Sequence, residues 1–207
     1  MKHAYTSKKR NTGDRKRKRF ILLSVEGDNK TETNYFNGFN SKEIKVIFAT
    51  GNDTDPVNLA MRLVEDYEAN QLDEELGDAA FCVVDGDVSK IREKQVLEAE
   101  KIVRKIGSVI VSNPCIEVWF LCHFILSSRQ YQSSKEVVSR LKEYIPNYEK
   151  NMKGIYELLE DKQEKAIKNA KTLDRINSDV DRKLHHHDYQ PSTEVYKIIK
   201  TISDANN

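Results

Sequence analysis

The sequence has few cysteines and no long apolar run. Cys82, Cys115 and Cys122 are odd in number, lie among apolar residues and lack C-x-x-C spacing. They therefore predict free buried thiols rather than disulfides or a zinc site. No apolar run approaches the roughly 20 residues of a membrane span, and no signal-type apolar segment follows the basic start. These absences argue against a secreted or membrane protein and favour a cytoplasmic one.

An excess of one charge sign is also missing, because the formal net charge is +1. Bulk electrostatics therefore gives no argument for nucleic acid as a partner. The distribution of charge is more informative, since the segment from Lys8 to Arg19 holds eight Lys or Arg residues and one aspartate. Such a block either binds phosphates or stays a solvated tail. We predict a basic, disordered tail over residues 1–19.

After the tail, short apolar runs alternate with helical patterns. Asp55 and Pro56 are expected to be the N-cap and first residue of one helix. Strands that alternate with helices indicate a parallel sheet covered on both faces. We therefore predict an α/β core over residues 20–128. Its expected strands are 20–25, 43–49, 79–84 and 108–112, and its expected helices are 31–39, 56–72, 91–106 and 114–126.

The pattern changes near residue 130, and no further strand is predicted after it. Amphipathic helices are expected at 134–145, 154–173 and 192–202, with Ser192 as the cap of the last one. We predict an α-helical extension over residues 129–207 that packs on the core or binds a partner. The three histidines at 185–187 precede Pro191, and we expect them to be solvated.

Acidic residues follow three of the predicted strands. The first strand is followed by Glu26 and the third by Asp85 and Asp87, while the fourth leads into a helix that carries Glu117. Ligands of parallel α/β sheets bind outside the carboxyl ends of the strands. We therefore expect these carboxylates to meet at one edge of the sheet.

The pair Asp85 and Asp87 has two interpretations. Side chains two apart on extended backbone point the same way, and Gly86 between them would let a ligand approach the backbone. The pair would then hold Mg²⁺ (or Mn²⁺), which takes oxygen ligands and relieves the repulsion between like charges. The alternative is a polar turn, because Asp and Gly are common turn residues.

An apolar run that ends on D-x-D occurs in several enzyme classes. In haloacid-dehalogenase-type phosphatases the first aspartate, here Asp85, is a nucleophile, and in sugar-nucleotide transferases the pair binds Mn²⁺. The phosphatase pattern expects the motif on the first strand, whereas about eighty residues precede it here. An EF-hand is excluded, because the glycine at position six and the glutamate at position twelve of such a loop are missing.

Glu26 distinguishes among these classes. A glutamate after the first strand, with D-x-D two strands later, resembles the Toprim domain of topoisomerases, primases and related nucleases. Further segments resemble the RloB-like family of Toprim proteins over nearly the whole chain after the tail: VEGDNKTETNYF, VVDGDVS, SNPCIEVWFLCHF, EKAIKNAK and PSTEVYKIIKTI. The resemblance implies an α/β, Toprim-like (Rossmann-like) sheet of about four parallel strands with a C-terminal helical extension.

The resemblance also implies a function. RloB-like proteins are encoded in bacterial defence and restriction-associated loci, often beside an ATPase partner called RloA. A metal-dependent nuclease acting on DNA or RNA, tRNA included, is implied. Glu26, Asp85 and Asp87 would hold Mg²⁺ (or Mn²⁺), with Glu26 as ligand or general acid/base. The alternative is a non-catalytic module that binds nucleic acid or a partner protein. A further alternative is a haloacid-dehalogenase-type phosphatase that uses Asp85. The protein could also form a homo-oligomer.

Two more glutamates are candidates for the site. Glu117 lies in a helix that is apolar nearly all round, so its carboxylate needs a cation or hydrogen-bond donors. We count it among the catalytic residues. Glu32 has two interpretations. It binds a second metal ion or supports the ligands of the first ion, or it is simply an acidic residue of the kind favoured in the first turn of a helix.

The remaining candidates are assigned to substrate binding. Lys30 and Lys90 lie close to the two acidic loops and would contact phosphates, or face solvent. Asn113 is expected to cap the helix at 114–126, with substrate contact as the minor option. His123 is either a core histidine or part of the site.

Overall fold

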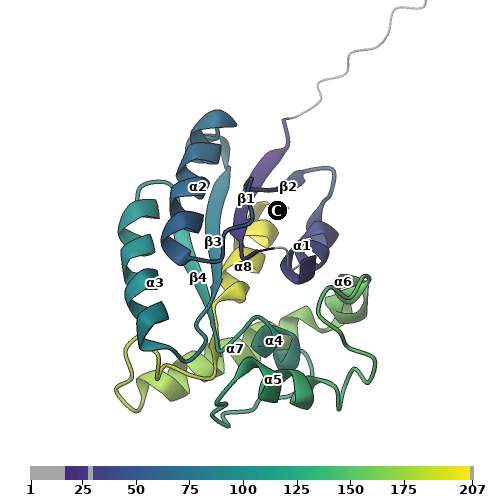
Figure 1. The fold of residues 1–207 in the computed structure, drawn as a ribbon. Helices are drawn as coiled ribbons and strands as arrows, with labels where there is room; N and C mark the ends of the chain where they lie inside the picture. Colours follow the sequence, from purple (N-terminus) through teal and green to yellow (C-terminus); the bar gives the residue numbers. More distant parts are fainter. Residues whose placement is uncertain (1–16, 28–29, 206–207) are drawn as a thin grey trace, which may run out of the picture.

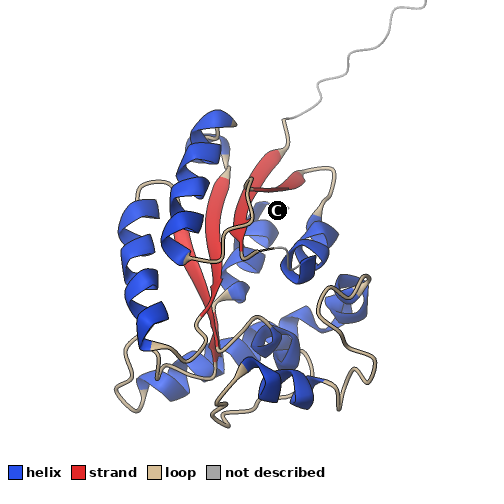
Figure 2. Cartoon of the chain, in the orientation of Figure 1, coloured by secondary structure: helices blue, strands red, loops and turns tan. Residues whose placement is uncertain are grey.

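A computed structural model of the chain describes residues 17–27 and 30–205. The sheet has five strands in the order β2-β1-β3-β4-β5 (Figures 1 and 2). The first four are parallel to their neighbours, and β5 runs antiparallel to β4. Their bounds are β1 (Arg19–Val25), β2 (Ile44–Phe48), β3 (Ala79–Asp85), β4 (Ser108–Asn113) and β5 (Ser192–Thr193). The predicted mixed α/β fold with a mainly parallel sheet is confirmed.

Helices cover both faces of the sheet (Figure 1). One face packs against α2 (Pro56–Ala69) and α3 (Lys90–Val103), and Leu22, Cys82 and Val84 point into this layer. The other face packs against α1 (Lys30–Phe36), α4 (Glu117–Cys122) and α8 (Val195–Ala205), with Leu23 and Val83 among its buried strand residues. Strands buried on both faces account for the unbroken apolar runs in the sequence.

Local signals set the helix starts that the sequence predicts. Asp55 caps α2, and its side chain accepts hydrogen bonds from the N–H groups of Val57 (2.9 Å) and Asn58, with Pro56 as the first helical residue. The three cysteines are free and buried, as predicted. Within the described residues, no helix has the length and apolar composition that a membrane crossing needs.

The last third of the chain differs from the prediction in two ways. The expected helix at 154–173 is divided, because 3-10 helix η3 (Glu160–Lys162) separates the two pieces. Ser192 is not a helix cap: it lies in β5, and its hydroxyl donates to the Tyr189 carbonyl. A two-residue strand has too few residues to show an alternating pattern. The helices here are α5 (Ser134–Leu141), α6 (Ile155–Leu159), α7 (Gln163–Ser178) and α8, and shorter 3-10 turns are η1 (Asn37–Phe39) and η2 (Glu74–Leu76).

The prediction that the three histidines are solvated is wrong. His185 is buried, and its two ring nitrogens face the carboxylates of Glu100 and Glu194. Burial alone would lower the pKa of His185, but the hydrogen bonds and charges of Glu194 and Glu100 raise it above its ordinary value. His186 and His187 are half-buried beside Glu93. Acidic residues of α3 therefore hold this loop, which the sequence pattern around the histidines does not reveal.

We expect His185→Ala to lower the free energy of unfolding by about 2 kcal/mol at pH 6, because it removes a donor from buried Glu194. Glu194 keeps Lys197 and the Val111 N–H group as partners, which limits the loss. Because the pKa of His185 is higher in the folded protein than the value of about 6.5 in the unfolded chain, protonated His185 stabilises the fold at a pH below about 6.5. This stabilisation is lost as the pH rises through the pKa of the folded protein. Urea unfolding at pH 6 and at pH 9 measures it. The matched control is His186→Ala, and an equal loss in both variants would contradict the assignment.

Candidate active site

The carboxyl ends of the strands bring four of the predicted acidic residues to one edge of the sheet. Glu26 follows β1, Asp85 ends β3, and Glu117 is the first residue of α4, just beyond β4. A carboxylate oxygen of Glu26, Oε1, accepts a hydrogen bond from the Asp85 N–H group at 3.0 Å. Glu32, on α1, contributes a fourth carboxylate whose charge acts on Asp85. The expectation that Glu26, Asp85 and Glu117 meet at one edge of the sheet is correct.

Asp85 and Asp87 do not share an extended backbone. Asp85 points toward α4, where its Oδ1 accepts from the Ile116 N–H group at 2.9 Å. Asp87 has a φ of +53°, in the left-handed region, and its side chain is 49% exposed. A left-handed turn redirects the second carboxylate, so the geometric premise that both side chains point the same way is wrong. Asp87 instead lies at the rim of the cluster.

Arg92, on the first turns of α3, lies among these groups. Its guanidinium pairs with Glu26 through Nη2 and lies 3.6 Å from Asp87 through Nε. It also donates to the main-chain oxygens of Asp85 (3.2 Å) and Thr54 (2.6 Å). The planar guanidinium thus holds the ends of β1 and β3 together, and it supplies the positive charge nearest to Glu26.

Glu117 is the most deeply buried acid of the cluster, with 1% of its surface exposed. The Tyr148 hydroxyl donates to its Oε1 at 2.9 Å, while its Oε2 is buried and has no hydrogen-bond partner. The five residues that follow it in α4 are all buried, as the apolar pattern predicts. An unpaired carboxylate oxygen in such surroundings is costly, so it suits a cation or a hydrogen-bond donor as partner.

Glu32 resembles Glu117 in this respect. It is 6% exposed, and its Oε2 is also buried without a partner. The residue before it, Thr31, accepts at its hydroxyl from the N–H group of Asn151, 3.0 Å away. Loop 148–151 therefore contacts both α1 and Glu117. Of the two interpretations of Glu32, these contacts favour membership of the cluster.

The pKa values record the crowding of like charges. Burial raises the pKa of Glu26 to about 7, although Arg92 and the Asp85 N–H group oppose the shift. Burial, with the charges of Glu117 and Glu26, raises the pKa of Glu32 to about 7. Burial and the charges of Glu32, Glu26 and Glu117 raise the pKa of Asp85 well above its usual range. Such shifts are typical of buried carboxylates that repel one another.

A divalent cation fits the donor set. The unpartnered oxygens of Glu32 and Glu117 are hard carboxylate ligands of the kind that Mg²⁺ binds. In the side-chain conformations of residues 17–27 and 30–205, however, no three His, Cys, Asp or Glu groups are arranged to hold a metal ion. Glu26 is engaged by Arg92 and Asp85 by the Ile116 N–H group. Metal binding therefore requires side-chain rotations.

A family model described as RloB-like protein matches residues 21–202, from β1 to α8. The chain belongs to the RloB-like family. The searches of curated proteins and of solved structures gave no match.

In this RloB-like protein, Asn113 is not the helix cap that the sequence predicts. It is the last residue of β4, and its Oδ1 accepts from the Val88 N–H group at 3.2 Å. Its amide nitrogen donates to main-chain oxygens of the histidine loop, including that of His187 at 3.1 Å. A Cβ at Gly86 would lie 2.7 Å from the Asn113 side chain. The glycine of D-G-D therefore makes room for Asn113, which fastens the Asp85–Asp87 turn.

The remaining predicted residues lie in different places. Lys30 and Lys90 are exposed and begin α1 and α3, next to the acidic loops. His123 is fully buried; its Nδ1 lies 3.0 Å from the Trp119 carbonyl, and burial lowers its pKa to about 4. Its contacts are with the aromatic core, which fits the core interpretation.

Three residues of this edge were not predicted: Arg92, Tyr148 and Lys150. Arg92 lies seven residues after Asp85 in the amphipathic pattern of α3, where a basic residue is ordinary. Tyr148 and Lys150 come from a loop more than thirty residues after Glu117. Only the three-dimensional fold brings that loop to the strand ends.

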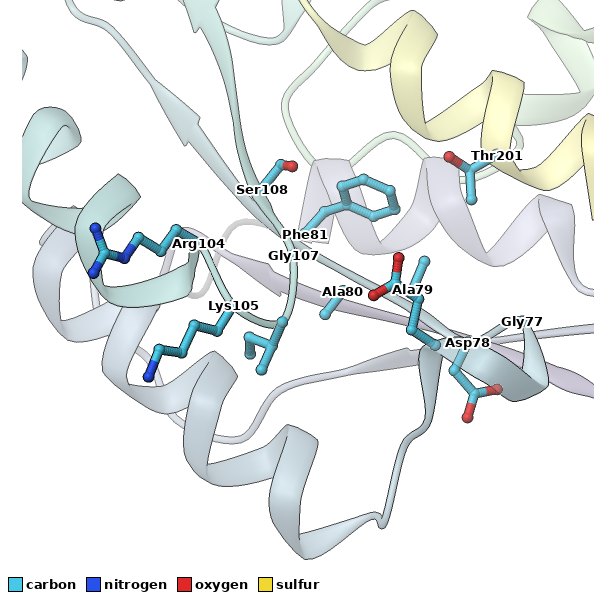
Figure 3. Close-up of a pocket in the computed structure, with 12 residues that line it drawn as sticks. Gly77, Asp78, Ala79, Ala80, Phe81, Arg104, Lys105, Gly107, Ser108 and Thr201 are labelled. Carbon is cyan, nitrogen blue, oxygen red and sulfur yellow. The ribbon is translucent and has the colours of Figure 1, made fainter.

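A cavity of about 420 Å³ lies at the opposite, amino-terminal edge of the sheet (Figure 3). Arg104 and Lys105 lie on one side of it and Asp78 on the other. Asp78 is already paired with Arg17, at 2.8 and 2.6 Å, and accepts from the N–H groups of Phe20 and Asp73. The Asp78 carboxylate therefore already has hydrogen-bond and charge partners, and this cavity is the weaker candidate for an active site.

Proposed function

We propose that this RloB-like protein is a metal-dependent nuclease that hydrolyses phosphodiester bonds. The observation that carries the proposal is the group of crowded carboxylates at the strand ends, two of which, Glu32 and Glu117, have buried oxygens without partners. Mg²⁺ (or Mn²⁺) is the proposed cofactor, and nucleic acid, whether DNA or RNA, is the proposed substrate. Carboxylate sites for such ions are typical of phosphoryl-transfer enzymes.

The residues of the site have separate roles in this proposal. Asp85, Glu117 and Glu32 would hold the cation, which when bound stabilises negative charge on the phosphate and assists deprotonation of water. Glu26 has a pKa of about 7, the value suited to a general base near neutral pH. Arg92 fixes the position of Glu26, and Asp87, exposed at the rim, would bind the outer side of the cation.

The proposed biological setting follows from family membership. RloB-like proteins are encoded in bacterial defence and restriction-associated loci, and we infer that this protein acts against phage together with an RloA-like ATPase. The surface that contacts the ATPase is not assigned. Cytoplasmic localisation belongs to the same proposal.

The deciding experiment is a cleavage assay with the full chain. Labelled single- and double-stranded DNA and RNA, including tRNA, are incubated with Mg²⁺, Mn²⁺ or EDTA, with and without an RloA-like ATPase. Cleavage that needs the divalent ion supports the proposal. Absence of cleavage under every condition, with intact binding, would show a binding module instead. A phosphoryl group found on Asp85 by mass spectrometry would identify a phosphatase.

Within this assay, we expect Glu26→Gln to lower the cleavage rate about a hundredfold, since a general base typically contributes 10²- to 10⁴-fold. The rate is measured from pH 5 to pH 9, and the rise near pH 7 seen in the wild type should be absent in the variant. Glu149→Gln, on the loop beside the site, is the matched control. A wild-type rise that persists in Glu26→Gln would assign the base to another residue.

The non-catalytic module keeps one specific observation in its favour. Arg92 pairs with Glu26 and lies near Asp87, so a protein cation already occupies that side of the cluster. If this pairing were permanent, the fold would bind its ligand without hydrolysing it. Arg92→Ala separates the two functions in the cleavage assay, because release of Glu26 changes the cleavage rate only when Glu26 acts in catalysis.

A further inference from the structure

A second cavity, with a volume of about 630 Å³, lies beside the carboxylate cluster. It is lined by four residues of α5 and by two residues that follow this helix. The lining residues are Ser134, Lys135, Val138, Ser139, Lys142 and Lys150. We call it the lysine pocket. Its charged lining residues are all basic, and its serine hydroxyls add neutral hydrogen-bonding groups.

Within the described residues, the three lysines of the pocket are not paired with carboxylates. The nearby acids of α5 and the turn after it have other partners, Glu136 with Arg129 and Glu143 with Arg140. The pocket therefore keeps its positive charge, and its ligand is expected to be an anion.

Lys150 connects the pocket to the carboxylate cluster. Burial alone would lower its pKa, but the charges of Glu117 and Asp85 raise it above the ordinary value. The loop holds Lys150 in place, since Tyr148 donates to Glu117 and Asn151 accepts from the Lys30 N–H group at 2.8 Å. Lys150 therefore lies between the acids and the pocket, where a ligand that reaches both would contact it.

The wall of the pocket also touches the cluster through α5. Ser134, the first residue of α5, interacts with the buried Cys115 thiol, which in turn interacts with Glu117. Helix α5 lies against α4 (Figure 1). The pocket and the carboxylate cluster are therefore neighbours in the fold.

We propose that the lysine pocket binds the phosphodiester backbone of a nucleic acid and directs the strand into the carboxylate cluster. Lysine ammonium groups are point charges that suit phosphates, and the alkyl stems with Val138 provide an apolar surface for the sugar. This inference rests on the proposed function, which it extends by naming the groups that hold the substrate. An acidic protein surface is the competing occupant.

The experiment measures binding in EDTA, so that no cleavage occurs. Short labelled single- and double-stranded DNA and RNA are titrated with the full chain at several KCl concentrations. The test variant combines Lys135→Ala, Lys142→Ala and Lys150→Ala. The control combines Lys45→Ala, Lys168→Ala and Lys200→Ala, which removes the same charge from exposed lysines outside the pocket.

We expect the test variant to bind at least about tenfold more weakly, and the slope of log K against log [KCl] to fall by about 2 to 3, because each phosphate contact contributes about 0.7 to 0.9. The control variant should keep the wild-type slope. Replacing the same three lysines by arginine should also keep it. Circular dichroism checks that all variants are folded.

The outcomes separate this inference from the nuclease proposal. Wild-type protein that binds through the three lysines but never cleaves supports the pocket and overturns the nuclease. Metal-dependent cleavage with equal slopes in the test and control variants overturns the pocket and leaves the nuclease intact. Displacement of the nucleic acid by polyglutamate as effectively as by unlabelled nucleic acid overturns the pocket as a backbone site and identifies an acidic protein ligand.

Discussion

In EDTA, the protein is expected to lose about 3 kcal/mol of its free energy of unfolding as the pH rises from about 5 to about 8. Burial and neighbouring negative charges raise the pKa of Glu26 and of Glu32 to about 7, above the ordinary 4.5. Between these values the folded protein keeps protons that the unfolded chain has released. Stability therefore falls with rising pH across this window. Urea unfolding at a series of pH values measures the slope.

Mg²⁺ is expected to reverse this loss at pH 8, because an ion that binds the folded state alone stabilises it. Glu32→Gln should reduce the pH slope in EDTA, whereas Glu157→Gln, an exposed glutamate of α6, should leave it unchanged. His185 contributes a slope of the same sign, so the comparison between these variants, rather than the wild-type slope alone, isolates the cluster. A Glu32→Gln variant with the full wild-type slope would contradict the crowding of these acids.

The second large effect concerns Asp85→Asn. We expect the variant to cleave about a thousandfold more slowly, a change of about 4 kcal/mol in the activation free energy, since one charge-stabilising group typically contributes 10²- to 10³-fold. Asparagine keeps an oxygen that accepts from the Ile116 N–H group, so the fold is retained. The rate is measured under single-turnover conditions in Mg²⁺ and in Mn²⁺.

The same substitution should make the protein more stable in EDTA at pH 8 by about 1 kcal/mol, because it removes a carboxyl group whose ionised form is opposed by burial and by the charges of Glu32 and Glu26. Loss of activity combined with gain of stability distinguishes a functional acid from a structural one. Asp179→Asn, an exposed aspartate after α7, is the matched control for both measurements. Loss of both activity and stability in Asp85→Asn would indicate that Asp85 mainly supports the fold.

Much of the fold could be predicted because its signals are local. Four apolar runs predicted the four parallel strands, and Asp55-Pro56 predicted the start of α2. The position of Glu26, Asp85 and Glu117 at one edge followed from the rule on strand ends, without any knowledge of contacts. Strand β5 was missed because it has two residues, and its pairing with β4 depends on the tertiary fold.

The inner arrangement of the site could not be predicted from spacing. The left-handed φ of Asp87 turns the second carboxylate away from the expected direction, and the D-G-D spacing alone does not specify that turn. The need for glycine at position 86 comes from Asn113, on a different strand. Arg92, Tyr148 and Lys150 act through contacts between segments far apart in the sequence.

The place where the basic segment joins the sheet has a further consequence. Arg17 is held by Asp78 at the amino-terminal edge, whereas the carboxylates and the lysine pocket lie at the carboxyl-terminal edge. A seven-residue strand such as β1 spans about 20 Å. A nucleic acid that contacts Arg17 and the lysine pocket together must therefore run along the full length of the sheet, so short fragments will bind one end or the other but not both.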